Sequence, residues 1–196
     1  MPSPVVILSS EILSDDWATL TKYRFERSHR DGSRHVHIHQ AYDRGNGVAV
    51  LPYDPDRGTV LLVRQFRLPV FLNPGERHKD GMLIEVCAGL LDVDRPEAEA
   101  RREAEEELGY RFKSLTEVFD AYMSPGSVTE RVIGYVTPYS PADRVSAGGG
   151  SAKEGEDIEI LEMPIDEALA LVKSGDIADG KTIILLQHVK LEGLIG

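Results

Sequence analysis

The chain has 196 residues, long enough for one domain with a sizeable core, and its contents of 41% hydrophobic and 28% charged residues are ordinary for a globular protein. Its 33 acidic and 22 basic residues give a formal net charge of −11. This acidic balance argues against binding to nucleic acids or anionic membranes, which both need a basic surface. An anionic substrate would need a metal ion to bring it to such a protein.

The single cysteine, Cys87, allows no internal disulfide and fits a reducing compartment. It lies in an apolar run, which favours an inert core residue over a nucleophile. The first residues lack the basic start of a signal peptide, and no segment approaches the roughly 20 apolar residues of a membrane span. We therefore expect a cytoplasmic protein that has no membrane partner.

Alternating apolar and polar residues predict three strands in the N-terminal part of the chain. In the third of them, His35, His37 and His39 share one face and could ligate a metal ion. A solvent-facing strand or a subunit contact explains the same pattern, and is favoured because no nearby carboxylate completes a site. The strands are expected at residues 5–13, 17–27 and 34–42.

The middle of the chain alternates turns with apolar segments and predicts further strands. The first two are expected to pair as a hairpin across the turn at residues 54–58. Near the end of the second, Arg64 and Arg67 could bind a diphosphate, or they could pair with the many acids. Residues 71–81 are expected to form a loop. The strands are expected at residues 48–53, 59–66, 82–87, 115–123 and 129–137.

Residues 96–108 predict a helix with clear end signals. Pro96 can occupy the first turn, Asp94 has capping-box spacing to Glu97, and Gly109 can end the helix in the left-handed conformation. A narrow apolar stripe on this helix is suited to docking closely on a sheet. The stripe consists of Ala100, Ala104 and Leu108.

Three carboxylates of this helix, Glu103, Glu106 and Glu107, fall on one face, because residues three and four apart are neighbours on a helix surface. Like charges at this spacing repel each other. A hard divalent cation such as Mg²⁺ or Mn²⁺, which prefers carboxylate oxygens, would make the crowding favourable. For the helix alone, a solvated acidic surface explains the pattern equally well.

Residues 141–153 are expected to form a loop, in which three consecutive glycines at 148–150 suit either a lid or a plain flexible connection. A second acidic cluster follows directly and includes Glu154 and Glu156. These carboxylates could complete a metal site or hold a water molecule. A solvated loop edge is the alternative.

Residues 175–182 fit the phosphate-binding pattern GxxxxGK[ST] of P-loop proteins. That chemistry needs a strand before the loop, whereas residues 166–173 have helical spacing. Asp176 and Asp179 would also place negative charge in a phosphate site. We therefore interpret the segment as a connection between two helices, the second of them at residues 181–192.

The order of these elements indicates an α+β fold, such as a three-layer α/β/α sandwich with a mixed sheet. Within it, residues 102–110, REAEEELGY, resemble the second half of the Nudix box, the signature of hydrolases acting on nucleoside diphosphates linked to another group. Asp94 stands where the family has its first glutamate, one residue too close to the preceding glycine. The chain also resembles the GDP-mannose pyrophosphatase branch over nearly its whole length. Its other matching segments are residues 11–15, 42–47, 64–67, 84–92, 122–126, 147–150 and 179–182.

The resemblance implies roles for ten residues. Mg²⁺, or Mn²⁺, would be ligated by Glu103, Glu107, Glu156 and the carbonyl of Ala88. Glu154 would act as the base for the attacking water, with Glu106 assisting. The substrate contacts would be Trp17, Arg67, Glu85 and Glu130.

The implied reaction is hydrolysis of GDP-mannose to GMP and mannose 1-phosphate, with ADP-ribose as the alternative substrate. The resemblance also implies a homodimer, in which an N-terminal β segment of residues 1–43 reaches the partner and residues 44–196 form the Nudix domain. A non-catalytic binding module is opposed by the intact carboxylates. A P-loop NTPase is opposed by its context, and on this basis Lys181→Ala should abolish turnover only in such an enzyme.

Overall fold

The computed structural model describes residues 4–91, 95–151, 153 and 155–195. Its contacts divide the chain into two units. The first unit is Met1–Asn46 with Tyr122–Arg131, and the second is Gly47–Ala121 with Val132–Gly196. No helix in the described part is long and apolar enough to cross a membrane.

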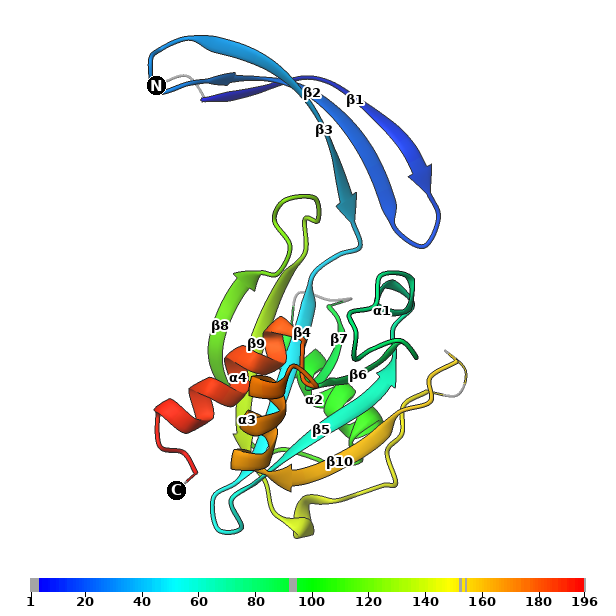
Figure 1. The fold of residues 1–196 in the computed structure, drawn as a ribbon, viewed down its shortest axis with the longest axis vertical. Coiled ribbons are helices and arrows are strands. Elements are labelled where there is room, and N and C mark those ends of the chain that lie inside the picture. The colour runs from blue at the N-terminus through cyan, green and yellow to red at the C-terminus, as the bar shows by residue number, and fades with distance from the viewer. Residues whose placement is uncertain (1–3, 92–94, 152, 154, 196) are drawn as a thin grey trace. The chain divides into compact units, whose positions relative to one another are not determined.

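The first unit contains an antiparallel sheet in the order β1-β2-β3 (Figure 1). The strands predicted here are confirmed, except that Trp17 lies in the turn before β2 instead of within it. Several large apolar side chains of β1 are exposed, among them Ile7 and Ile12. The strands are β1 (Val5–Asp15), β2 (Thr19–Ser28) and β3 (Arg34–Asp43).

The second unit is built on a mixed sheet in the order β10-β5-β4-β9-β8, with β6 paired to β5 and β7 paired to β4. The β4–β9 pair is parallel, and β4 pairs antiparallel with β5 and β7. The bounds are β4 (Gly47–Asp54), β5 (Thr59–Phe66), β6 (Met82–Glu85), β7 (Cys87–Leu90), β8 (Thr116–Tyr122), β9 (Arg131–Pro138) and β10 (Glu159–Pro164).

Three details of this sheet differ from the sequence prediction. The expected β4–β5 hairpin pairs only next to its turn, at Tyr53–Val60 and Asp54–Thr59, because β6 and β7 fill the gap between the diverging strands. The strand predicted at 82–87 is divided at Val86 into β6 and β7. Strand β10, which pairs with β5, was missed because the residues before it read as an acidic loop.

Helices cover both faces of this sheet. Alternate residues of β4 explain the layering: Val48 and Val50 belong to the core that contains Ala100 and Ala104 of α2, and the intervening residues of β4 are buried as well. Helix α4 also contacts β4, and α3 contacts β10 and α4. The α/β/α sandwich is thereby confirmed. The helices are α1 (Leu68–Leu72), α2 (Pro96–Glu107), α3 (Ile165–Ser174) and α4 (Gly180–Leu191), with a short 3₁₀ turn at Pro141–Asp143.

The apolar stripe of α2 is fully buried, as predicted: Ala100, Ala104 and Leu108 are each 0% exposed. Ala104→Leu is expected to lower the free energy of unfolding by about 1–3 kcal/mol, because three extra carbons must enter a filled interface. Urea unfolding measures the change. Ala98→Leu, at an exposed position of the same helix, is the control and should stay within about 0.5 kcal/mol of wild type. Equal losses in both variants would contradict the docking argument.

Candidate functional site

Local structure covers the C-terminal end of helix α2, where the carboxylates of interest lie. Its first residue is Pro96, and the residue that precedes it, Arg95, makes no side-chain capping bond. Asp94 lies outside the described residues, and the expected capping box with it. At the other end Gly109 adopts φ +77°, and a Cβ there would meet the Ser146 carbonyl oxygen at 2.5 Å. The helix end is therefore closely covered by a loop, which fixes the last carboxylates.

The carboxylates of α2 gather as predicted, and a protein cation lies among them. Glu107 is 2% exposed, and its Oε2 accepts a hydrogen bond from the Ala88 N–H at 3.2 Å. Arg102 pairs with Glu103, and its Nη1 donates to Glu106 Oε2 at 2.7 Å. This arginine also reaches Glu99, which is buried.

Burial of these carboxylates is costly in the absence of a metal ion. Desolvation, reinforced by Glu103 and Glu156, raises the pKa of Glu107 to about 8. Desolvation also raises the pKa of Glu103 to about 7, against the opposing effect of Arg102. Glu156 raises the pKa of both glutamates and so belongs to the same electrostatic cluster, although it comes from a distant segment.

The three glycines form neither a lid nor a free connection in this structure. The N–H groups of Gly149 and Gly150 donate to the carbonyls of Glu107 and Glu106, at 2.8 and 3.2 Å. All three glycines have positive φ, and a Cβ at Gly148 would meet the Glu107 carbonyl oxygen at 2.6 Å. The segment is therefore a strap on the end of α2.

The strap leads into Glu156, whose Oε2 accepts the Ser151 N–H at 2.8 Å. A Cβ at Gly150 would lie 2.6 Å from the same oxygen, so the strap leaves room for this carboxylate by lacking side chains. Glu154 lies outside the described residues. The structure thus brings Glu156 to the carboxylates of α2 and does not describe the expected base.

The donor set of this cluster suits a hard divalent cation. Carboxylate oxygens and a backbone carbonyl are the ligands that Mg²⁺ and Mn²⁺ prefer. Burial is the main reason why the pKa values of Glu103 and Glu107 are raised, and neighbouring carboxylates raise them further. Within the described residues, no group of three or more His, Cys, Asp or Glu side chains is arranged to hold a metal ion. The chemistry of the donors fits a cation, and the Arg102 contacts occupy part of the set.

Gly89, next to Ala88 on β7, leaves room for Glu103, because a Cβ at position 89 would overlap the Glu103 carboxylate. Gly89→Ala is therefore expected to push Glu103 aside and to weaken divalent-metal affinity about 10-fold. Calorimetric titration with Mn²⁺ tests the change. Gly126→Ala, where no atom of the described residues lies within 4 Å of the added carbon, is the control. Unchanged affinity in Gly89→Ala would show that Glu103 does not depend on this space.

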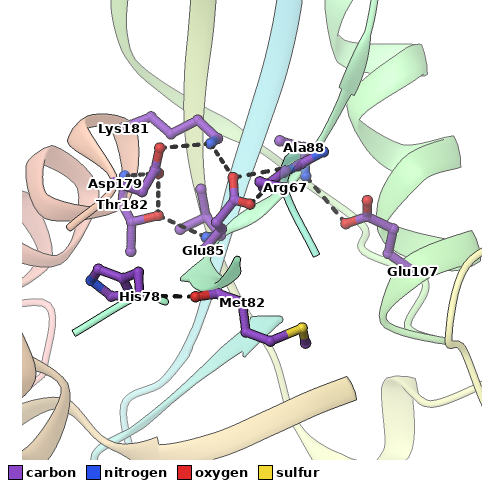
Figure 2. A network of polar contacts seen from close by, with 10 residues as sticks. Arg67, His78, Met82, Glu85, Ala88, Glu107, Asp179, Lys181 and Thr182 are labelled. Carbon is purple, nitrogen blue, oxygen red and sulfur yellow. Dashed lines mark hydrogen bonds and ion pairs between the residues drawn. The ribbon is translucent and has the colours of Figure 1, made fainter. Parts of the chain in front are cut away.

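A second polar cluster lies beside α2, at the end of β6 (Figure 2). Glu85, 2% exposed, accepts from Arg67 Nε at 2.6 Å and from Lys181 Nζ at 2.6 Å. Burial disfavours the ionised form of this carboxylate, but Lys181 and Arg67 outweigh it and hold its pKa below the usual value. Arg67 thus pairs with an acid, which is one of the two alternatives predicted from the sequence. Arg64 is also near acids, Asp80 and Glu159.

The segment that fits the P-loop pattern joins α3 to α4, as interpreted from the sequence. Its lysine donates to the carboxylates of Glu85 and Asp179, at 2.6 and 2.9 Å, instead of pointing into a phosphate nest. Sequence reasoning missed Lys181 and Asp179 as members of the site. The available signal was the Asp-Gly-Lys-Thr match to the resembling family.

The two other expected substrate contacts lie in the first unit. Trp17 is 69% exposed, and the Arg44 guanidinium lies 5.3 Å from the centre of its ring. The same arginine pairs with Glu130 at 3.3 Å. Sequence reasoning missed Arg44, although it falls in the matching segment at 42–47.

On the histidine face of β3, the imidazole rings lie next to one another and next to His29. His37 Nε2 lies 3.3 Å from His29 Nε2, across the hairpin end. Its ring centre lies 6.1 Å from that of His39. A solvent-facing strand and a subunit contact stay the predicted explanations of this face. Cys87 is fully buried, and burial raises its thiol pKa well above the usual value, so it is an inert core residue as predicted.

Comparison with known proteins identifies the family. The NUDIX domain family matches residues 43–186, and the GDP-mannose pyrophosphatase NudK N-terminal domain family matches residues 4–42. Proteins named GDP-mannose pyrophosphatase are similar along their whole length. That of Pectobacterium atrosepticum is 47% identical over 193 residues, 98% of this chain and 97% of the relative. That of Salmonella arizonae is 44% identical over 196 residues, 100% of both.

A solved structure described as an ADP compounds hydrolase aligns with a TM-score of 0.69 and 18% identity, over 98% of each chain. At this level of sequence identity, the similarity shows a shared fold and nothing further. The family matches and the relatives cover nearly the whole chain, including the carboxylates of α2 and the glycine strap. The chain therefore belongs to the Nudix family.

Proposed function

We propose that this protein is a metal-dependent pyrophosphatase that hydrolyses GDP-mannose to GMP and mannose 1-phosphate. The observation that carries the proposal is the partly buried carboxylate cluster of α2, with Arg67 held on a neighbouring strand end. Such a pairing of a cation site with a phosphate-binding arginine suits a diphosphate. The full-length relatives named GDP-mannose pyrophosphatase support this substrate.

Mg²⁺, or Mn²⁺, is the proposed cofactor. It would be held by Glu103, Glu107, Glu156 and the carbonyl of Ala88. When bound, it would neutralise charge on the diphosphate oxygens and make an attacking water more acidic. Arg102 would then keep Glu106 and Glu99 in place by the ion pairs that it already makes.

The protein's own groups have distinct tasks in this proposal. Glu154 accepts a proton from the attacking water, and Glu106 assists it. Arg67 donates to the diphosphate, where it stabilises the charge that develops on the leaving phosphate. Glu85 was expected to contact substrate or a metal-bound water. With both oxygens held by Arg67 and Lys181, it instead serves to orient these cations.

Substrate contacts from the first unit complete the proposal. Trp17 would present its ring near the nucleobase in the site of the partner subunit, and Glu130 would contact the substrate or a metal-bound water. A homodimer is proposed to form through the N-terminal sheet, because β1 exposes many large apolar side chains. The protein is proposed to act in the cytoplasm without nucleic-acid or membrane partners, in keeping with its net charge of −11.

ADP-ribose is the second candidate substrate. The solved neighbour described as an ADP compounds hydrolase shares the fold, and that likeness alone favours no base or sugar. A non-catalytic module is disfavoured, because the chain has both Glu103 and Glu107, the first half-buried and the second buried.

The test is a panel of nucleoside-diphosphate sugars with Mg²⁺ or Mn²⁺, in ¹⁸O-water with mass analysis of both products. We expect GDP-mannose to give the highest kcat/KM, and the label to mark which phosphorus the water attacks. Preferred turnover of ADP-ribose would replace the substrate assignment. No turnover of any diphosphate would overturn the assignment as a pyrophosphatase.

A further inference from the structure

The side chains of Lys181 and Thr182, at the start of α4, are directed at the sheet rather than at solvent. Lys181 Nζ donates to Glu85 Oε2 at 2.6 Å and to Asp179 Oδ1 at 2.9 Å (Figure 2). The other oxygen of Asp179 caps the helix, because Oδ2 accepts the Thr182 N–H at 3.0 Å. Asp179 therefore joins the beginning of the helix to the lysine through two different oxygens.

Glu85 passes this restraint on to Arg67. Its Oε1 accepts from Arg67 Nε at 2.6 Å, and its Oε2 accepts from Nη2 at 3.3 Å as well as from Lys181. A carboxylate that binds two nitrogens of a guanidinium fixes the plane of that group. Among the described residues the hydrogen bonds of Arg67 come from Nε and Nη2, which leaves the N–H groups of Nη1 available to a substrate.

The charges of the four side chains balance. Glu85 and Asp179 are negative, and Arg67 and Lys181 are positive. Loss of the Lys181 charge would leave a net negative cluster in which the buried Glu85 relies on Arg67 alone. An anionic substrate would then meet repulsion at the position where it needs a cation.

The first turn of α4 also holds the backbone of the sheet by an uncharged bond. Thr182 Oγ1 accepts the Val86 N–H at 2.8 Å, at the point where β6 ends and β7 begins. This bond does not involve Arg67. The Thr182 hydroxyl also donates to Asp179 Oδ2 at 2.6 Å, which is not the oxygen that binds Lys181. The bond to Val86 therefore provides a way to separate a structural effect from an electrostatic one.

We propose that Asp179 and Lys181 are positioning residues that hold Arg67, through Glu85, in the orientation that receives the substrate diphosphate. The inference rests on the proposed function and deepens it, because it names what orders the phosphate-binding arginine. The Gly-Lys-Thr sequence that resembles a P-loop acts here on a protein carboxylate. Lys181→Ala is consequently expected to impair a Nudix pyrophosphatase too, and does not single out a P-loop enzyme.

The test uses the full chain and two charge-removing variants, Asp179→Asn and Lys181→Met. Asparagine caps a helix as well as aspartate does, so the first variant keeps the beginning of α4. We expect KM for GDP-mannose to rise about 10-fold in each, the effect of losing one charge-assisted hydrogen bond. We expect kcat to fall as well, because Arg67 is also proposed to stabilise the charge that develops on the leaving phosphate. Lys181→Arg should restore most of the affinity.

Nitrogen-15 spectra of arginine side chains give a readout that needs no turnover. The Arg67 Nε–H signal, assigned by its absence in Arg67→Lys, should shift or broaden in both charge-removing variants. Lys190→Met, on the exposed end of α4 where it pairs with Asp166, should leave both the signal and KM unchanged. Thr182→Val should lower stability while leaving the signal in place.

An unchanged Arg67 signal with unchanged KM in Asp179→Asn and Lys181→Met would overturn the inference. So would equal changes in Thr182→Val, because general loosening of α4 would then explain them. Should the wild-type protein hydrolyse no diphosphate, the proposed function fails. The arginine spectra would still decide whether Asp179 and Lys181 order Arg67.

Discussion

Glu107→Gln is expected to lower kcat for nucleotide-sugar hydrolysis by about 10³-fold while leaving the fold intact. Glutamine has nearly the same volume, and its amide oxygen can still accept the Ala88 N–H that Glu107 binds at 3.2 Å. The variant loses the negative charge that would hold the metal ion. A metal ion contributes several kcal/mol to such a transition state, and about 4 kcal/mol corresponds to the stated factor. Steady-state kinetics at saturating Mg²⁺ measures the loss.

Glu105→Gln on the same helix is the matched control. The Glu105 side chain is 40% exposed and pairs with Arg111, so its replacement should leave kcat within about 3-fold of wild type. Thermal unfolding should show both variants folded. Near-normal turnover by Glu107→Gln would remove α2 from the proposed metal site, and with it the main support for the pyrophosphatase assignment.

The metal-free protein is expected to lose stability as the pH rises from about 5 to about 8. Burial raises the pKa of Glu107 to about 8 and that of Glu103 to about 7, from an ordinary value of 4.5. Between these values the folded state keeps protons that the unfolded state has released. The slope of the unfolding free energy against pH is proportional to the number of protons bound by the unfolded state minus the number bound by the folded state. This difference is negative here, so the free energy of unfolding falls as the pH rises. Denaturant unfolding in EDTA across this range measures the fall.

A divalent cation should reverse this trend, because metal and protons compete for the same oxygens. Apparent Mn²⁺ affinity is expected to rise with pH, by up to about 10-fold per unit for each proton displaced. Glu107→Gln isolates the contribution of one group, and should flatten both pH profiles compared with wild type. Parallel profiles in the two proteins would show that Glu107 is already ionised in the folded metal-free state.

The sequence predicted the elements of the site well where local spacing decides the structure. The face shared by Glu103, Glu106 and Glu107 follows from helix geometry, and so does the buried stripe that includes Ala104. Likewise, the interpretation of residues 175–182 as a helix connection is confirmed, because the helical pattern before them excludes a strand. These features need no knowledge of the distant chain.

Pairing between distant segments could not be read from the sequence. The alternation of β4 and β5 predicts a hairpin, yet β6 and β7 enter between its diverging ends, and β10 takes the outer edge of β5. Register and strand order depend on competition among several possible partners, which local patterns do not rank. The glycines at 148–150 were read as flexible for the same reason, since the helix end that they cover is some forty positions away.

By itself, the sequence determined that an acidic helix with three carboxylates on one face follows a strand, because hydrophobic period, end signals and charge spacing are properties of a short segment. Only the tertiary structure decided which cation meets which acid. Lys181 reaches Glu85 across 96 positions of the chain, and their contact exists because α4 packs its first turn onto the division between β6 and β7. An ion pair between distant segments depends on where the fold places two side chains, and twenty-two basic and thirty-three acidic residues allow far too many pairings for composition to choose among them.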